Sequence, residues 1–128
     1  GLIPVLVAVL KEDNDDTRNE ACCILWNLAS AEPNKIPMTE PSLGLLPTLV
    51  DIVKSDRREA SMEACGVIMA LASADPNKIL LADPELGLIT ELVTILKEEK
   101  NPGRLNACGS LMLIVMAPEN KVLLASAE

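Results

Sequence analysis

The chain repeats itself every 43 residues, and this period constrains its fold more than any other feature. Glycines open the repeats at positions 1, 44 and 87. Three further sets of residues share the spacing: Ala21, Ala64 and Ala107; Cys22, Cys65 and Cys108; and the Asn-Lys pairs that begin at Asn34, Asn77 and Asn120. A fixed period of this length is typical of repeat proteins, in which each unit buries its apolar face against its neighbours. The sequence therefore predicts three copies of one supersecondary unit.

Each copy has the pattern of two helices followed by a short third one. After each opening glycine, apolar residues recur at helical spacing, as at Leu45, Leu49 and Ile52, and predict a first helix of about ten residues. A polar turn and a longer helix follow, and we expect this helix to end near Ser30, Ser73 and Met116.

Prolines and polar residues mark the ends of these elements. In the third copy we expect Asn101 to cap the long helix, with Pro102 in its first turn. The third helix begins at Asp75-Pro76-Asn77-Lys78 and its equivalents. It must end before Pro41 and Pro84, because a proline disfavours helical geometry in the residue that precedes it.

Composition excludes several classes of function. The chain contains no His, which removes the usual imidazole bases, metal ligands and pH switches, and the net charge of -8 disfavours nucleic acids and anionic membranes. Its four cysteines lack the spacing of a zinc or redox site, so we expect a reducing compartment, either cytoplasm or nucleus. The apolar run at 111–117 is far shorter than the roughly 20 residues that span a bilayer. No cofactor and no metal site are expected.

The repeats closely resemble the armadillo family. The resemblance rests on Gly-Leu-Leu-Pro-Thr-Leu-Val-Asp-Ile-Val at 44–53, on Glu-Ala-Cys-Gly-Val-Ile-Met-Ala-Leu-Ala at 63–72, and on Leu-Trp-Asn-Leu-Ala at 25–29 before Pro33-Asn34-Lys35. It implies an all-α fold, a right-handed α-solenoid of armadillo-like repeats with a period of 43 residues. Glycine at positions 66 and 109, with Cys23 at the corresponding position, looks more like the β-catenin and plant U-box type than like nuclear-import receptors.

In this frame residues 1–128 form a single armadillo-repeat array. Residues 1–43 are repeat 1 without its first helix, 44–86 are repeat 2, and 87–128 are repeat 3, ending in a short helix that begins the next repeat. We expect the chain to be a segment of a longer protein, because apolar residues such as Leu2, Val5 and Val122 stand where a terminal repeat should be polar. Further repeats or partner chains would cover these ends.

The resemblance also implies a concave groove that binds an extended or helical partner segment. Its candidate partner-binding residues lie on the long helices: Asp16, Glu20, Cys23, Asn27, Ser30, Glu59, Glu63, Ala70, Ser73, Asn106, Leu113 and Met116. Gly66 and Gly109 share this face, and close helix packing or an approaching partner would explain a glycine in mid-helix. The repeated cysteines are most simply small core residues at one packing position.

Two features of this face allow more than one interpretation. The pairs Asp16 and Glu20, and Glu59 and Glu63, each lie four residues apart on one helix face; they either clamp a Lys or Arg of a peptide or form a solvated acidic surface. Asn27 could donate to and accept from a peptide backbone, or it could hydrogen-bond within its own repeat.

We therefore expect a non-catalytic protein interaction scaffold or adaptor. Its expected partner is a protein or peptide, which can carry basic residues, rather than a nucleic acid or a membrane. The alternative is a structural or assembly subunit of a larger complex, held through its convex face and open ends.

Overall fold

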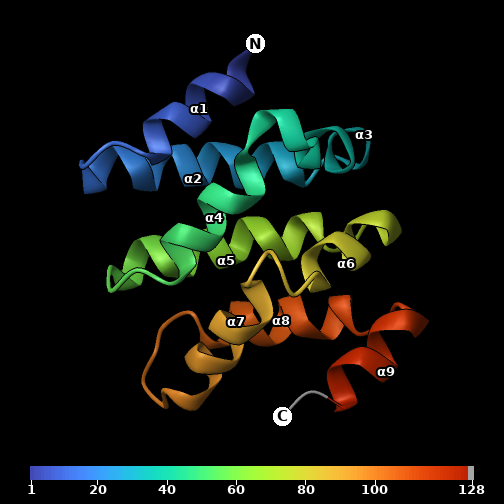
Figure 1. Ribbon diagram of the computed structural model, residues 1–128. Coiled ribbons are helices and arrows are strands. Elements are labelled where there is room, and N and C mark those ends of the chain that lie inside the picture. Colours follow the sequence, from blue (N-terminus) through green and yellow to red (C-terminus); the bar gives the residue numbers. More distant parts are fainter. Residues whose placement is uncertain (127–128) are drawn as a thin grey trace.

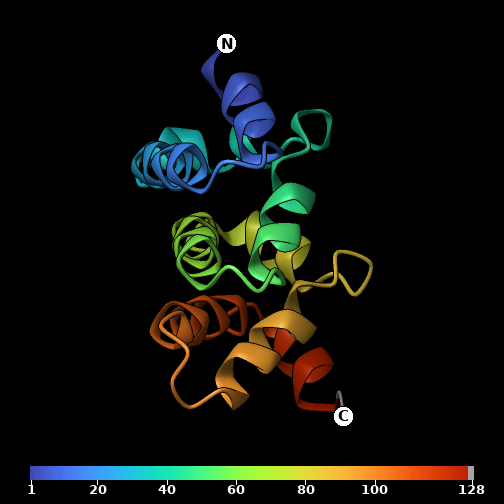
Figure 2. The ribbon, with the colours of Figure 1, turned by 90° about the vertical axis from the view of Figure 1, so that its left-hand side faces the viewer.

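The helices of the chain are arranged in two layers that run the length of a stack, as Figures 1 and 2 show for a computed structural model describing residues 1–126. One layer holds the long helices α2 (Asp15–Ala29), α5 (Arg58–Leu71) and α8 (Arg104–Ile114). The other holds α1 (Leu2–Leu10), α4 (Leu45–Val53) and α7 (Leu88–Lys97). The two termini lie at opposite ends of the stack (Figure 1). The chain is thus an α-helical solenoid.

Short helices complete each repeat beside these layers. They are α3 (Glu32–Lys35), α6 (Asp75–Ala82) and α9 (Pro118–Ser126). In the first repeat Pro37 has no N–H to continue α3, and the chain passes through 3₁₀ turns at Pro37–Thr39 and Pro41–Leu43. In the second repeat α6 runs to Ala82 and stops because Asp83, before Pro84, is extended.

The start of α8 differs from the sequence prediction. The helix begins at Arg104, with Gly103 as its N-cap, and not directly after Asn101. The side-chain oxygen of Asn101 instead accepts a hydrogen bond of 2.8 Å from the Gly103 N–H. Asn101 therefore closes an Asx turn over Pro102 and delays the helix.

Glycines join one repeat to the next. Gly44 and Gly87 have φ values of 69° and 77° and lie in the left-handed region, where a side chain is strained. Each stands directly before the first helix of its repeat, α4 or α7. The opening glycine of the second and third repeats is therefore required by the backbone.

Adjacent long helices approach closely because large side chains lie against glycines. The Trp26 ring of α2 covers Gly66 of α5, where an added Cβ would lie 2.1 Å from Cζ3 of the ring. Met69 of α5 covers Gly109 of α8 in the same way, with its Sδ 2.5 Å from the position of an added Cβ. The mid-helix glycines are thus explained by the packing of one repeat on the next.

Buried asparagines tie the repeats together through their backbones. Asn77 is fully buried, and its amide donates to Lys35 O of the preceding repeat at 2.8 Å and to Leu71 O at 2.9 Å. Asn120 makes the equivalent bonds to Lys78 O and Ile114 O. These bonds join the backbones of adjacent repeats inside the core, although Leu71 O and Ile114 O also accept from the N–H groups of Ala74 and Ala117.

We predict opposite effects for alanine at the two glycines. In Gly66→Ala the rigid Trp26 ring must move, and overpacking of about 1–3 kcal/mol outweighs the gain in helix propensity of about 1 kcal/mol. In Gly109→Ala the flexible end of Met69 moves instead, so the variant should be as stable as the parent or more so. Urea unfolding followed by circular dichroism measures both, and Trp26→Met in the Gly66→Ala background should restore stability. Equal stability of the two alanine variants would contradict this packing.

We predict that Asn77→Ala lowers the free energy of unfolding by about 2–3 kcal/mol, because three buried hydrogen bonds are lost: those that Asn77 donates to Lys35 O and Leu71 O and the one that it accepts from Thr39. Asn34 is the matched control, since it is only half buried and donates to Leu28 O within its own repeat. Asn34→Ala should cost less than about 1 kcal/mol. Urea unfolding measures both variants. An equal loss of unfolding free energy at both positions would argue against a stabilising contact of Asn77 between repeats.

Candidate functional site

The candidate groove residues lie on one face of the stack, which we call the long-helix face because α2, α5 and α8 form it. Most are exposed; Glu63, Ala70, Asn106 and Leu113 are partly buried. Gly66 is the exception, because Trp26 covers it and leaves no open position there. The structure thus gathers the predicted residues on a common surface, with part of that surface filled by Trp26.

The long helices contact one another far more extensively than α1, α4 and α7 do. In Figure 2 the long helices stack closely on one side, while the shorter first helices spread along the other. The long helices therefore provide the main lateral contacts between successive repeats.

An acidic site lies where α2 and α5 meet on this face. The thiol of Cys23 donates to Oε2 of Glu63 at 3.2 Å, across the gap between the helices. The hydrogen bond to Glu63 raises the pKa of Cys23, and partial burial and the charges of Glu63, Glu20 and Glu59 raise it further. The surface here favours a cation and disfavours a thiolate.

The three cysteines that recur every 43 residues differ in exposure according to their position in the stack. Cys22 and Cys65 are buried, and burial raises the pKa of each thiol to about 12. Cys108 occupies the same position in the third repeat but is exposed. All four are free thiols, and Cys23 and Cys108 are the candidates for reaction with reagents because they are exposed.

Polar side chains on the face are partly engaged within the protein. The Asn27 amide donates to Cys23 O at 2.9 Å, so Asn27 hydrogen-bonds within its own repeat. The side-chain carbonyl oxygen of Asn27 stays available as an acceptor. Ser30 donates to Trp26 O. Lys35, although nearly buried, donates to the Ser73 hydroxyl at 2.6 Å and to Ala70 O at 3.0 Å.

The third repeat gives the face a different character. Asn106 donates to Met62 O at 3.1 Å, so its amide is used between α5 and α8. Met112 and Met116 are 62% and 58% exposed. The long-helix face therefore changes from acidic at α2 and α5 to apolar at α8.

Sequence reasoning missed that Trp26 fills part of this face, and that Lys35 of α3 donates to Ala70 and Ser73. The signal that could have found Trp26 is an offset of 40 residues, which relates Cys23 to Glu63, Trp26 to Gly66 and Met69 to Gly109. It identifies neighbours across adjacent long helices. A period of 43 residues alone identifies equivalent positions but not contacts.

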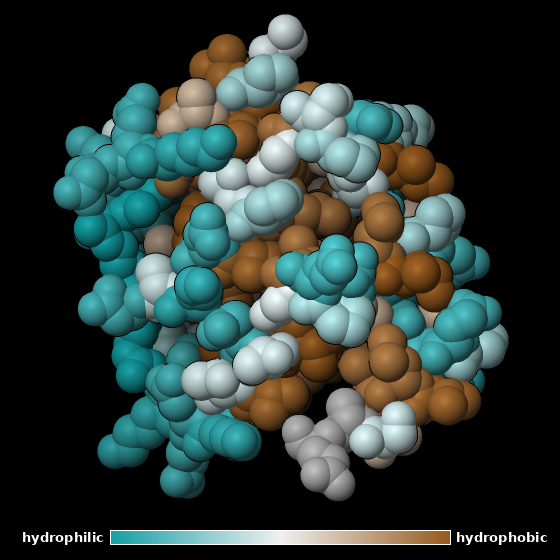
Figure 3. Space-filling view, viewed as in Figure 1, coloured by the Kyte–Doolittle hydropathy of each residue, from teal (hydrophilic) through white to brown (hydrophobic). Residues whose placement is uncertain are grey.

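The opposite face and the loops carry other surface features. Figure 3 shows the face of α1, α4 and α7, where apolar patches lie among polar side chains and a hydrophilic edge follows the loops that precede the long helices. At that edge Arg57 pairs with Asp13 at 2.6 Å and with Asp15. Within residues 1–126, no group of three or more His, Cys, Asp or Glu side chains is arranged to hold a metal ion, and no helix has the length and apolar character needed to cross a membrane.

Comparison with known proteins supports an armadillo-like repeat fold. Residues 1–30 match the family model of the Armadillo/beta-catenin-like repeat. Three engineered proteins solved by the Northeast Structural Genomics Consortium are similar in structure, with TM-scores of 0.81, 0.78 and 0.80 at 23%, 24% and 24% sequence identity. Their matches cover 92%, 88% and 91% of this chain but only 48%, 45% and 28% of those proteins, so this chain spans less than half their length. No curated protein matches this chain significantly.

We predict that Glu63→Gln lowers the pKa of Cys23, because the variant loses the charge that most strongly disfavours the thiolate. At a fixed pH below that pKa, Cys23 should then react faster with iodoacetamide. Mass spectrometry resolves each site across a pH series, and Cys108, outside this acidic site, serves as the internal control. An unchanged pH profile for Cys23 would show that Glu63 does not act on the thiol.

Proposed function

We propose that the chain is a non-catalytic protein interaction scaffold that binds an extended partner segment along the long-helix face. The repeating unit is 43 residues, and the subtype is that of β-catenin and plant U-box proteins rather than that of nuclear-import receptors. The partner is a protein or peptide, not a nucleic acid, and the setting is the reducing environment of the cytoplasm or nucleus.

The acidic site between α2 and α5 carries this proposal. Glu20 and Glu59 are exposed, and Glu63 is partly exposed while it accepts the Cys23 hydrogen bond across the two helices. These carboxylates act together on one thiol, which supports a concentrated negative potential at this point. A Lys or Arg side chain of the partner would form charge-assisted hydrogen bonds here.

The neighbouring groups favour an extended segment that crosses the repeats. Asn27 retains an exposed carbonyl oxygen next to the acidic site and can accept from a backbone N–H of the partner. Further along, Leu113 and Met116 offer apolar contact. A partner with a basic residue followed by an apolar anchor would match this order.

A second candidate function is assembly within a larger complex through the ends of the stack. Exposed apolar side chains at both ends favour it, among them Leu2, Val5 and Leu105, which are 54%, 60% and 81% exposed. This candidate uses different surfaces, so variants on the long-helix face distinguish the two functions.

We predict that Glu20→Lys and Glu59→Lys each weaken binding of an extended peptide with spaced Lys and apolar residues by at least about tenfold, equivalent to about 1.4 kcal/mol. The reason is that each variant replaces an attraction by a repulsion at the same site. Fluorescence anisotropy of the labelled peptide measures the affinity, and binding should weaken as salt rises.

Asp51→Lys is the matched control for this experiment, because Asp51 is exposed on α4 in the other layer and the variant changes the net charge equally. It should bind the peptide within about twofold of the parent. An equal loss in Asp51→Lys would indicate attraction to the overall charge alone, and no binding by the parent would reject the groove.

A further inference from the structure

A polar cavity lies between the second and third repeats, at the edge formed by the turns that precede the long helices. Its volume is about 340 Å³, within the range of about 300–1,000 Å³ that is usual for small-ligand sites. The turn between α4 and α5 lines it on one side, and α7 with the turn that follows lines it on the other. Figure 1 shows these turns on the same side of the stack as the turn between α1 and α2. Asp56 and Thr94 are exposed parts of the lining, so solvent reaches the cavity.

An arginine stands at the equivalent position in the other two repeats. The lining of the cavity includes Ser61, which is 4% exposed and corresponds at the 43-residue period to Arg18 and Arg104. The Ser61 hydroxyl donates to Val53 O at 2.8 Å. Arg104 Nε donates to the equivalent carbonyl, Leu96 O, at 2.9 Å. Serine is too short to occupy the space that an arginine takes at this position.

The wall that faces this position also differs between repeats. The carboxylates of Glu91 and Glu98 line the cavity from the third repeat. One repeat earlier, where the Arg18 side chain is only 13% exposed, the equivalent residues are Thr48 and Ser55, which are neutral. The facing wall is thus neutral where the chain carries its own nearly buried arginine, and acidic where serine replaces it.

The charged groups of the lining favour a cation. Three of them are acidic and two are basic: Asp56, Glu91 and Glu98 against Lys54 and Arg58. Arg58 pairs with Glu98 at 3.0 Å, and Glu91 forms no ion pair within residues 1–126. Val53 O adds negative partial charge, because it belongs to the C-terminal turn of α4.

We propose that this cavity binds the guanidinium group of an arginine side chain that a partner protein inserts from solvent. The partner's arginine takes the place that Ser61 leaves open. Its five N–H donors match the acceptors that surround the space, which are Val53 O and the carboxylates of Glu91 and Glu98. The cavity shares no lining residue with the acidic site between α2 and α5, so it is tested separately from the long-helix face.

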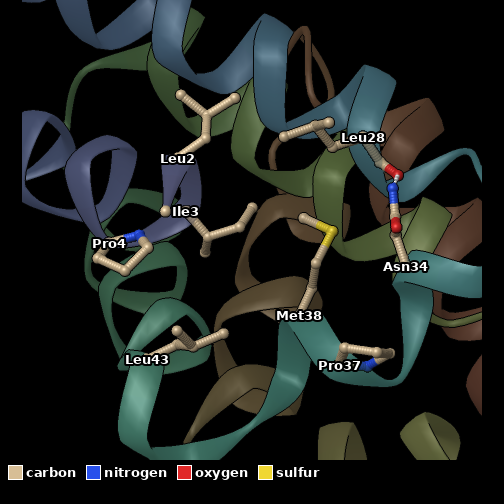
Figure 4. A pocket seen from close by; sticks show the side chains of 9 residues that line it. Leu2, Ile3, Pro4, Leu28, Asn34, Pro37, Met38 and Leu43 are labelled. Atoms are coloured by element: carbon tan, nitrogen blue, oxygen red, sulfur yellow. Dashed lines mark hydrogen bonds between the residues drawn. The ribbon is translucent and has the colours of Figure 1, made fainter.

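A larger cavity shows why the charge of the lining matters. It has a volume of about 450 Å³, and Figure 4 shows Ile3, Leu28 and Met38 around it. No charged side chain is among the described residues that line it. A guanidinium group would lose its hydration there without gaining a partner, so we assign the arginine to the polar cavity alone.

Binding of a single arginine side chain tests the proposal first. The probe is Nα-acetyl-L-arginine amide, and Nα-acetyl-L-lysine amide is the control with the same charge. In an NMR titration of the whole chain, the backbone amide signals of Ser61 and Glu91 should shift and saturate with a Kd of about 10 mM or below. The lysine probe should bind at least about tenfold more weakly, because an ammonium lacks the planar fork of N–H donors. No saturable shift at these residues, or equal binding of both probes, would overturn the proposal.

Ser61→Arg supplies the missing arginine from within the chain. The introduced side chain should donate to Val53 O as Arg104 donates to Leu96 O. The variant should therefore bind the arginine probe at least about tenfold more weakly, and by circular dichroism it should melt at the same temperature as the parent or higher. Undiminished binding would contradict the assignment, and so would a lower melting temperature, since the space would then not accept an arginine.

Glu91→Gln tests the facing wall without changing its shape. Binding of the arginine probe should weaken by at least about threefold, because a charge-assisted hydrogen bond becomes a neutral one. Glu20→Gln is the matched control, since it removes the same charge from the long-helix face, and it should bind the probe at Ser61 within about twofold of the parent. An equal loss in both variants would indicate attraction to the overall charge and reject the site.

A final comparison identifies the source of the guanidinium group. The peptide Gly-Gly-Arg-Gly-Gly carries the side chain on a backbone, as a partner protein does, whereas ethylguanidinium carries the same group alone. The peptide should bind at Ser61 at least as tightly as ethylguanidinium, and Ser61→Arg should abolish this binding. Binding of ethylguanidinium without binding of the peptide would assign the cavity to a small molecule and overturn the partner protein as its source.

Discussion

Sideways packing of one long helix on the next is the constraint on which the rest of the structure depends. A single repeat offers too little apolar surface to bury, so each repeat completes the core of its neighbour. Trp26 against Gly66 and Met69 against Gly109 set how closely the helices approach. Asn77 and Asn120 fix the register of the same interfaces through backbone carbonyl groups. The placement of α2, α5 and α8 side by side on the long-helix face follows from these contacts.

The chemistry of that face follows from what the packing leaves outside. Side chains that lie between α2 and α5 pack the two helices together, while carboxylates such as Glu20 and Glu59 remain exposed to solvent. Glu63 does both, because it accepts from Cys23 across the helices and still adds to the negative surface. Glu63 thus contributes both to the packing of α2 on α5 and to the negative charge of the face, and this supports a binding role for the face.

The helical repeats and the exposed face could be predicted from the sequence because they depend on local pattern. Periodic apolar residues, prolines in first turns and opening glycines act within a few residues of their own position. Contacts across repeats could not be predicted in this way. Trp26 lies against Gly66, and Cys23 donates to Glu63, because of the lateral spacing of the helices. Asn101 was misassigned as a cap because an Asx turn and an N-cap share the same residue preference.

The glycines that join the repeats have a consequence for how such a protein can diversify. Gly44 and Gly87 have nearly the same backbone angles, with φ of 69° and 77° and ψ of 15° and 9°, and beyond the adjacent residues of the chain no atom lies within 4 Å of where their Cβ would be. The turn at each of these joints is therefore set by the main chain and not by contacts of a side chain. Residues on the long-helix face can change from acidic to apolar, as they do between α2 and α8, while the backbone angles at these joints stay nearly the same. New specificities can evolve repeat by repeat on an unchanged frame.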